Sequence, residues 1–232
     1  MRSLISFFLL GLILVLSGCS LEYKYRAHKG YFEEEVQKLE ELDEYQNMED
    51  YLLFMGSSSI RLWKTVAEDM KPYPAIKRGY GGAHYYDFIH YVERLIDDKD
   101  QAQAVLIFVA NDITGKNSWD KRHKDLSPRE IEKLVKVITK KIHKQLSPDL
   151  PIYIIETPPT PSRWHVWDKI SEANDLIKEF TDQKPNLHFI STRNHFFNDR
   201  GRPEGKFFRR DSLHLSDAGY DLWEEIIKKN LK

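Results

Sequence analysis

Short apolar runs alternate with segments of helical periodicity along most of the chain. Five apolar runs predict strands, over residues 51–55, 75–78, 104–109, 151–156 and 187–190. Helical patterns occupy residues 31–46, 164–180 and 216–230, and Ser127, Pro128 and Glu130 carry the start signals of a further helix. Apolar strands separated by helices are typical of a parallel sheet covered on both faces. We therefore expect an α/β fold, a three-layer α/β/α sandwich around a five-stranded parallel sheet.

Polar or glycine-rich segments follow three of these predicted strands. Gly56-Ser57-Ser58-Ser59 follows the first strand, Gly79-Tyr80-Gly81-Gly82 follows the second, and Ala110-Asn111-Asp112 follows the third. In open parallel sheets, ligands bind at the carboxyl ends of the strands. The three segments are therefore expected to share one site.

Ser58 is the candidate nucleophile of that site. It lies where a predicted strand turns into a helix, although Gly-Ser-Ser-Ser-Ile differs from the Gly-x-Ser-x-Gly turn of α/β-hydrolases. The alternative is that residues 57–59 only cap the following helix. Ser57 or Ser59 is compatible with capping while Ser58 attacks.

Two groups are candidates to stabilise an oxyanion together with Ser58. Gly82 can take a positive φ and point its backbone N–H into the site, and Asn111 offers a side-chain amide donor. Each has a simpler interpretation, since glycines and Asn-Asp pairs often form turns after strands. Asp112 is expected to brace the loop rather than to react.

Asp211 and His214 lie three residues apart, just before the last predicted helix. His214 is a candidate general base for Ser58, and Asp211 is a candidate to hold the imidazole tautomer. In isolation, the simpler interpretation is preferred, in which Asp211 is a loop aspartate and His214 a surface histidine.

These four segments together resemble the SGNH hydrolases, also called the GDSL-like esterase/lipase family. The resemblance spans roughly residues 52–231 and implies a flavodoxin-like SGNH hydrolase fold. It implies catalytic residues Ser58, Asp211 and His214, and an oxyanion hole formed by Ser58, Gly82 and Asn111. Three departures are visible: Gly-Ser-Ser in place of Gly-Asp-Ser at residues 56–58, Ala110 where a glycine is common, and Ala83 where an aspartate is frequent.

A proline-rich loop, Pro158-Pro159-Thr160-Pro161, follows the fourth predicted strand and leads into Arg163 and Trp164. Its residues form either a substrate-facing wall, with Arg163 and Trp164 binding substrate, or a loop packed on the sheet. His84, Asp87 and His90 lie on one predicted helix, but their spacing does not put them on a single face as in metal-binding His-Glu-x-x-His. No metal or other cofactor is expected.

The N-terminus resembles the signal peptide of a bacterial lipoprotein. Residues 4–16 are almost entirely apolar and end in Leu16-Ser17-Gly18-Cys19, and Cys19 is the single cysteine of the chain. We expect a signal peptide over residues 1–18, lipid attachment at Cys19, a polar tether over 19–30 and the hydrolase domain over 31–232. The alternatives are an ordinary signal peptide or a retained N-terminal anchor.

These features predict a serine esterase on the outside of a bacterial cell envelope, held to a membrane by lipid. The preferred substrates are small acyl esters, such as acetyl groups on a carbohydrate. A lysophospholipase or thioesterase and a non-catalytic, glycan-binding lipoprotein are the alternatives. A net charge of −1 gives no indication of nucleic-acid binding, and the oligomeric state stays open.

Overall fold

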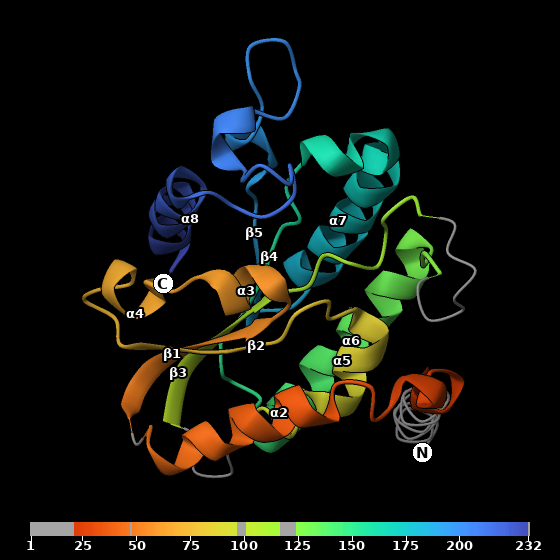
Figure 1. Cartoon of the computed structure of the whole chain (residues 1–232). Helices are drawn as coiled ribbons and strands as arrows, with labels where there is room; N and C mark the ends of the chain where they lie inside the picture. Colours follow the sequence, from red (N-terminus) through yellow and green to blue (C-terminus); the bar gives the residue numbers. More distant parts are fainter. Residues whose placement is uncertain (1–20, 47, 97–100, 117–123, 232) are drawn as a thin grey trace, which may run out of the picture.

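A computed structural model of the chain describes residues 21–46, 48–96, 101–116 and 124–231. One five-stranded sheet forms the centre of the molecule (Figure 1). Its strands are β1 (Glu49–Gly56), β2 (Ala75–Gly79), β3 (Gln101–Phe108), β4 (Ile152–Ile155) and β5 (Leu187–Ile190). The spatial order is β2-β1-β3-β4-β5 and every pairing is parallel. The predicted α/β fold with a five-stranded parallel sheet is therefore confirmed.

Helices precede the first strand, connect the strands and follow the last one. They are α2 (Glu33–Glu40), α3 (Ser58–Leu62), α4 (Val66–Asp69), α5 (Tyr85–Tyr91), α6 (Pro128–Gln145), α7 (Trp167–Asp182) and α8 (Asp217–Asn230). Short 3-10 helices add η1 (Arg26–His28), η2 (Glu41–Glu44), η4 (Pro161–Val166), η5 (Arg193–His195) and η6 (Gly205–Phe207). The predicted start of α6 is observed, because the Ser127 side chain accepts a bond from the Glu130 N–H and the Glu130 side chain accepts one from the Ser127 N–H.

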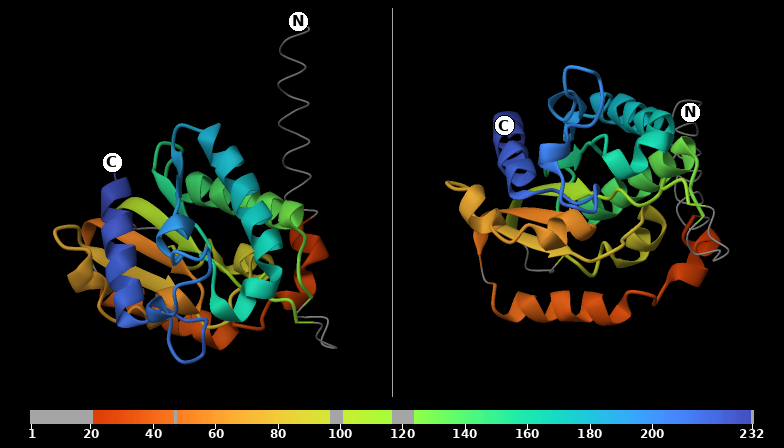
Figure 2. Two further views of the ribbon diagram at one scale, coloured as in Figure 1. Left: turned by 90° about the horizontal axis from the view of Figure 1, so that it is seen from above. Right: turned by 45° about the horizontal axis from the view of Figure 1, so that its top comes forward.

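Successive residues of the strands face opposite layers. Leu53 and Met55 of β1 belong to a core with α2, α5, α6 and α7, whereas Leu52 and Phe54 belong to a second core with α3, α4 and α8. Figure 2 shows the consequence, with α2 and α8 on opposite sides of the sheet. Because both faces are covered, the strands are apolar along most of their length.

The strand order places the site where the chain changes direction across the sheet. The chain runs from β1 outward to β2 and then returns past β1 to β3, so the loops after β1 and β3 leave the sheet edge side by side. Gly56 ends β1 with a φ of +138°, and a Cβ there would lie 1.9 Å from the Phe108 carbonyl oxygen. Only glycine permits this close approach, which turns the chain directly from β1 into α3.

The segment expected to be a polar tether differs from that expectation. Residues 21–24 are helical, η1 follows, and Tyr25 is buried, with its ring stacked on Tyr86 of α5. Lys24 also forms an ion pair with Glu130 at 2.6 Å. Burial of an aromatic ring stabilises the docked segment, even though most neighbouring residues are polar. Residues 21–30 therefore pack on the folded domain.

Residues 1–20 lie outside the described residues, and with them the apolar run over residues 4–16 and Cys19. Within the ranges that the structure describes, no helix has both the length and the apolar character needed to cross a membrane.

Candidate active site

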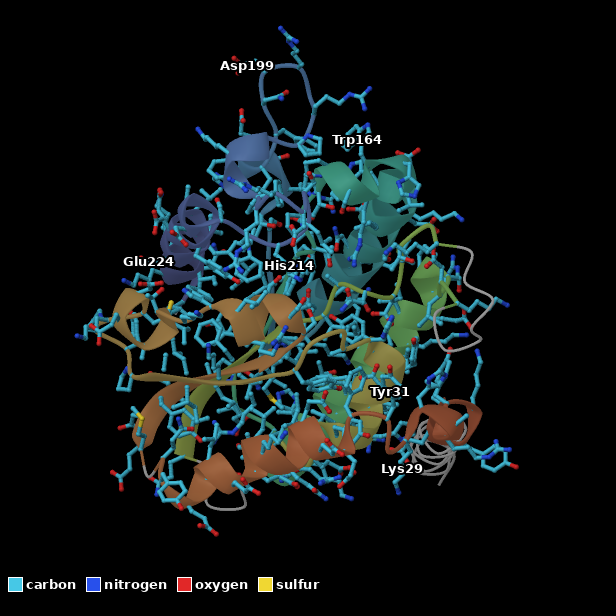
Figure 3. The ribbon with its side chains drawn as sticks, in the orientation of Figure 1. Lys29, Tyr31, Trp164, Asp199, His214 and Glu224 are labelled. Carbon is cyan, nitrogen blue, oxygen red and sulfur yellow. The ribbon has the colours of Figure 1, made fainter. Side chains whose placement is uncertain are left out.

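Ser58, His214 and Asp211 form one hydrogen-bonded chain at the carboxyl end of the sheet. Ser58 Oγ lies 3.0 Å from His214 Nε2, and His214 Nδ1 lies 2.6 Å from Asp211 Oδ2. In Figure 3, His214 lies beside α3, the helix that begins with Ser58. With the proton on Nδ1 directed at the carboxylate, Nε2 is free to accept the Ser58 proton. Residues 156 positions apart are thereby brought together as a candidate nucleophile and base.

Backbone groups hold Asp211 in place. Its Oδ1 accepts from the N–H groups of Leu213 and His214, both at 3.0 Å, and the positive φ of Ser212 allows this tight loop. Burial alone would raise the pKa of Asp211, but the bonds from the His214 ring and the two N–H groups lower it to about 2. The carboxyl group is therefore ionised at neutral pH and can stabilise an imidazolium.

The helices next to Ser58 and His214 are also bonded to each other. Ser58 is the first residue of α3, with Ser57 as the N-cap, so its backbone N–H lacks an intrahelical acceptor. The Tyr220 hydroxyl of α8 donates to the Ser59 carbonyl at 2.8 Å. This bond connects the start of α3 to the helix that directly follows His214.

The two candidate oxyanion segments are also bonded to each other. The Asn111 amide nitrogen donates to the Ala83 carbonyl at 2.9 Å, next to Gly82, which has a φ of +81°. Asp112, the residue after Asn111, accepts from the Tyr85 N–H with both carboxylate oxygens, at 2.9 and 3.1 Å. Consecutive residues after β3 thus hold the loop between Gly82 and α5, which agrees with the bracing role expected for Asp112.

Asp112 is almost fully buried among these groups. Burial raises the pKa of its carboxyl to about 7, although the bond from the Tyr85 N–H and the nearby Arg163 oppose this increase. A group with this pKa changes its charge near neutral pH, directly beneath the candidate oxyanion loop.

Arg163 and Trp164 lie differently from each other. Arg163 is buried, and its guanidinium donates to Asn111 Oδ1 at 2.8 Å and to the Ala110 carbonyl oxygen. Trp164 is half-buried, and its ring packs against Trp167 and Phe197 toward the protruding loop that carries Asp199 (Figure 3). Of the two residues expected to bind substrate, Arg163 therefore donates hydrogen bonds to the segment that carries Ala110 and Asn111.

A pocket surrounds the reacting groups. It contains about 390 Å³ of empty space, part of it open to solvent. Its lining is Ser57, Ser58, Ser59, Phe108, Ala110, Asn111, Thr157, Pro158, Thr160, Arg163, Leu213, His214, Leu215 and Trp223. Ser58, His214 and Asn111 therefore share one pocket, while Gly82 is joined to it through the bond between Ala83 and Asn111 and is not among the described lining residues.

The histidine cluster has a structural part in the fold. His84 is the N-cap of α5, where its N–H donates to Asp87 Oδ2 at 2.9 Å, and the Tyr80 hydroxyl donates to the other Asp87 oxygen. His90 Nε2 contacts the Tyr25 carbonyl. The described part of the chain holds no group of three or more His, Cys, Asp or Glu side chains that suits a metal ion.

This arrangement supplies the groups needed for acyl transfer: a hydroxyl paired with a base, an ionised carboxylate behind the base, and a nearby amide donor. The bond between Arg163 and Asn111 was not foreseen from the sequence, because the two residues lie 52 positions apart and neither side chain alone indicates the other.

Comparisons with known proteins give a family and several similar folds. The sequence model of the GDSL-like lipase/acylhydrolase family matches residues 55–222, which include all five candidate catalytic and oxyanion residues. No curated protein matches the sequence.

Solved structures resemble the fold at low sequence identity. A protein from Streptococcus pneumonia described as a platelet activating factor is 16% identical, with a TM-score of 0.70 over 98% of this chain and 99% of that one. A GDSL-like lipase from Bacteroides thetaiotaomicron is 17% identical, with a TM-score of 0.58 over 78% and 86%. A mutant of an acetyl-xylooligosaccharide esterase from Geobacillus Stearmophilus is 13% identical, with a TM-score of 0.61 over 81% and 98%.

Proposed function

The chain belongs to the GDSL-like lipase/acylhydrolase family and is a carboxylic ester hydrolase, and we propose that it works through an acyl intermediate on Ser58. The observation that carries this proposal is the continuous chain of short contacts from Ser58 Oγ through His214 to Asp211. A serine hydroxyl is a weak nucleophile at neutral pH, so it needs a base within hydrogen-bond reach.

Acylation begins when the Ser58 oxygen attacks the carbonyl carbon of the ester. His214 Nε2 takes the hydroxyl proton, and the ionised Asp211 stabilises the imidazolium that forms. The tetrahedral intermediate then collapses, the bond to the alcohol oxygen breaks, and His214 returns its proton to that oxygen. The alcohol leaves and the acyl group remains on Ser58.

The negative charge of the intermediate needs hydrogen-bond donors that are in place before reaction. We assign this role to the backbone N–H groups of Ser58 and Gly82 and to the Asn111 amide. Asn111 has two amide hydrogens, and one of them is directed at the Ala83 carbonyl. The second remains for the oxyanion. Preorganised donors of this kind are typically worth about 3–4 kcal/mol each in the transition state.

Deacylation repeats the same steps with water as the nucleophile. His214 takes a proton from water as the water oxygen attacks the acyl carbon; the bond from that carbon to Ser58 Oγ then breaks, His214 returns the proton to Oγ, and the acid leaves. No step requires a metal or an organic cofactor, because the serine, the base and the donors complete the proton and charge transfers.

For the substrate, we propose a short acyl group, such as acetyl, on a carbohydrate. The pocket beside Ser58 is walled by Phe108, Leu215 and Trp223, three buried side chains that limit its depth. Trp223 also packs edge-on against Phe108, with ring centroids 4.7 Å apart, which restricts the movement of this wall. The similarity to the Geobacillus Stearmophilus acetyl-xylooligosaccharide esterase agrees with this proposal as an analogy of fold.

For the location, we propose that a lipid on Cys19 holds the enzyme on the outer side of a membrane in a bacterial cell envelope. The support is in the sequence: a short apolar run, small residues at positions 17 and 18, and the single cysteine of the chain directly after them.

Hydrolysis of a series of p-nitrophenyl esters, from acetate to palmitate, tests the proposal, followed by acetylated oligosaccharides. We expect kcat/KM to be highest for acetate and to fall as the acyl chain lengthens. Ser58→Ala should abolish turnover and labelling by a fluorophosphonate, whereas Ser59→Ala, the matched control, should retain most of both.

Other outcomes point to the alternative functions. A preference for long acyl chains or for thioesters would favour a lysophospholipase or thioesterase. Glycan binding without turnover and without labelling of Ser58 would overturn the esterase mechanism in favour of a binding protein.

A further inference from the structure

Arg163 has an arrangement that the reaction described so far does not use. Arg163 is 8% exposed, and burial lowers its pKa to about 10 even though Asp112 and Asp125 lie close enough to oppose the decrease. Removing a guanidinium from water is unfavourable in free energy, so a buried arginine is expected to have hydrogen-bond acceptors that offset its desolvation. Those acceptors identify what Arg163 does.

Both recorded acceptors of the guanidinium belong to the segment that follows β3. One nitrogen, Nη2, donates to Asn111 Oδ1 at 2.8 Å, and the other, Nη1, donates to the Ala110 carbonyl. Arg163 is itself held by Thr160, whose side chain accepts from the Arg163 N–H at 3.3 Å within η4. The loop after β4 thus presents a fixed, two-pronged donor to the loop after β3.

These contacts determine which way the Asn111 amide faces. The oxygen and nitrogen ends of an Asn side chain are nearly equal in size, so an amide with indifferent neighbours can exchange them by rotation. A guanidinium has only donors, so only the oxygen end of the amide can face it. The Ala83 carbonyl, in contact with Nδ2 at 2.9 Å, accepts only the nitrogen end. Asn111 therefore has one orientation, with Nδ2 toward the Gly82 loop.

We propose that Arg163 is a positioning residue of the oxyanion hole, which fixes the Asn111 amide as a donor and raises its donor strength through the adjacent positive charge. This inference rests on the proposed acyl-transfer function. It replaces the expectation that Arg163 binds substrate, since the guanidinium acts through Asn111. Charge-assisted hydrogen bonds are the stronger class, so loss of the guanidinium is expected to weaken the donor as well as to release it.

The test measures kcat and KM for p-nitrophenyl acetate in Arg163→Lys and Arg163→Gln, normalised to folded protein. Lysine keeps the charge but cannot bond Ala110 and Asn111 with fixed, parallel N–H groups. Glutamine keeps one donor without the charge. We expect kcat to fall by about 10- to 100-fold in both variants, less than the roughly 10²- to 10³-fold fall for a donor that is removed outright. KM should stay within about twofold, because the oxyanion exists only in the transition state.

A double-mutant cycle separates positioning from a direct role. In an Asn111→Ala background, Arg163→Lys should lower kcat by less than about twofold further, since the group on which it acts is gone. Arg78→Lys is the matched control, because it removes another buried guanidinium. Arg78 is bonded to Asp43 and Gln46 and, in the described part of the chain, makes no bond to Asn111 or Ala110. It should lower the melting temperature and leave kcat per folded molecule unchanged.

Each contrary result has one meaning. A rise in KM, or a loss that multiplies fully with that of Asn111→Ala, would show that Arg163 contacts the substrate and would overturn the inference. Unchanged kcat in both Arg163 variants would overturn it as well. If Asn111→Ala itself leaves kcat unchanged, the proposed oxyanion role fails first, which distinguishes the failure of the mechanism from the failure of this inference.

Discussion

Asp211→Asn is expected to damage turnover more than Asp211→Ala, although asparagine is the closer replacement. Asp211 Oδ1 accepts two backbone N–H groups, from Leu213 and His214, and these require an oxygen. In the Asn variant the amide oxygen should therefore stay there and turn its NH₂ toward His214 Nδ1. Two donors cannot face each other, so the imidazole would carry its proton on Nε2 and lose the ability to accept from Ser58.

The geometry also gives the magnitude. A charge pair about 4 Å apart near a protein surface is worth about 4 kcal/mol, and water reduces this because the Asp211 side chain is 48% exposed. Loss of the charge in Asp211→Ala should then lower kcat by about 10²-fold. The misplaced donor in Asp211→Asn adds roughly 1–3 kcal/mol, for a total fall of about 10³- to 10⁴-fold.

The assay compares kcat for p-nitrophenyl acetate in both variants, with Asp217→Asn as a control that neutralises a carboxyl group on α8. Nitrogen-15 NMR of His214 reports the tautomer directly, and we expect Nδ1–H in the wild type and Nε2–H in Asp211→Asn. Equal activity of the two Asp211 variants, or an unchanged tautomer, would refute the orientation argument.

Three further outcomes are expected. Ser58→Ala combined with His214→Ala should lower kcat no more than either single change, since both groups act in one proton transfer; multiplied losses would contradict this. The pKa of Asp112 is about 7 in the folded protein against 3.8 ordinarily, so its contribution to stability is full below pH 3.8 and is lost as the pH rises through 7. Between pH 5 and pH 8, the wild type should therefore lose roughly 3 kcal/mol of unfolding free energy relative to Asp112→Asn. Urea denaturation at both pH values measures this, and an equal difference between the two proteins at pH 5 and pH 8 would contradict it. Cys19→Ser should release the protein from membranes or block its processing, and salt-resistant membrane fractionation of that variant would support a retained anchor at residues 4–16.

The sheet was largely predictable because its strands are buried on both faces. The run over residues 104–109 corresponds to β3 (Gln101–Phe108), and residues 187–190 correspond to β5. Helix limits were less accurate: the helix predicted over 164–180 is divided into η4 and α7, because Pro161 and the Thr160 cap begin a separate turn. The helix predicted over 31–46 is observed as α2 (Glu33–Glu40), followed directly by the 3-10 turn η2 (Glu41–Glu44).

The candidate site was predictable as a list of residues and less so as a set of contacts. Ser58, Asn111 and His214 were selected because four segments together resemble one family and three of them follow predicted strands, whereas each residue alone has a simpler interpretation. The partners of Arg163 and Tyr220 were not predictable, because Asn111 Oδ1 and the Ser59 carbonyl become available to them only after the sheet has brought distant loops together. Sequence patterns describe residues that are close together along the chain, whereas these hydrogen bonds join residues 52 and 161 positions apart.

The folded N-terminal segment has a consequence for how far the enzyme can reach. Residues 21–46 are described without a gap, with Tyr25 packed against Tyr86 and Glu22 paired with Lys141. A fully extended chain spans about 3.5 Å per residue, so the proposed lipid on Cys19 would lie at most about 7 Å from residue 21. With the proposed lipid at Cys19, this short connection would keep the enzyme close to the membrane surface. Its esters would have to be presented within a thin layer above the bilayer, at a height set by the folded domain itself.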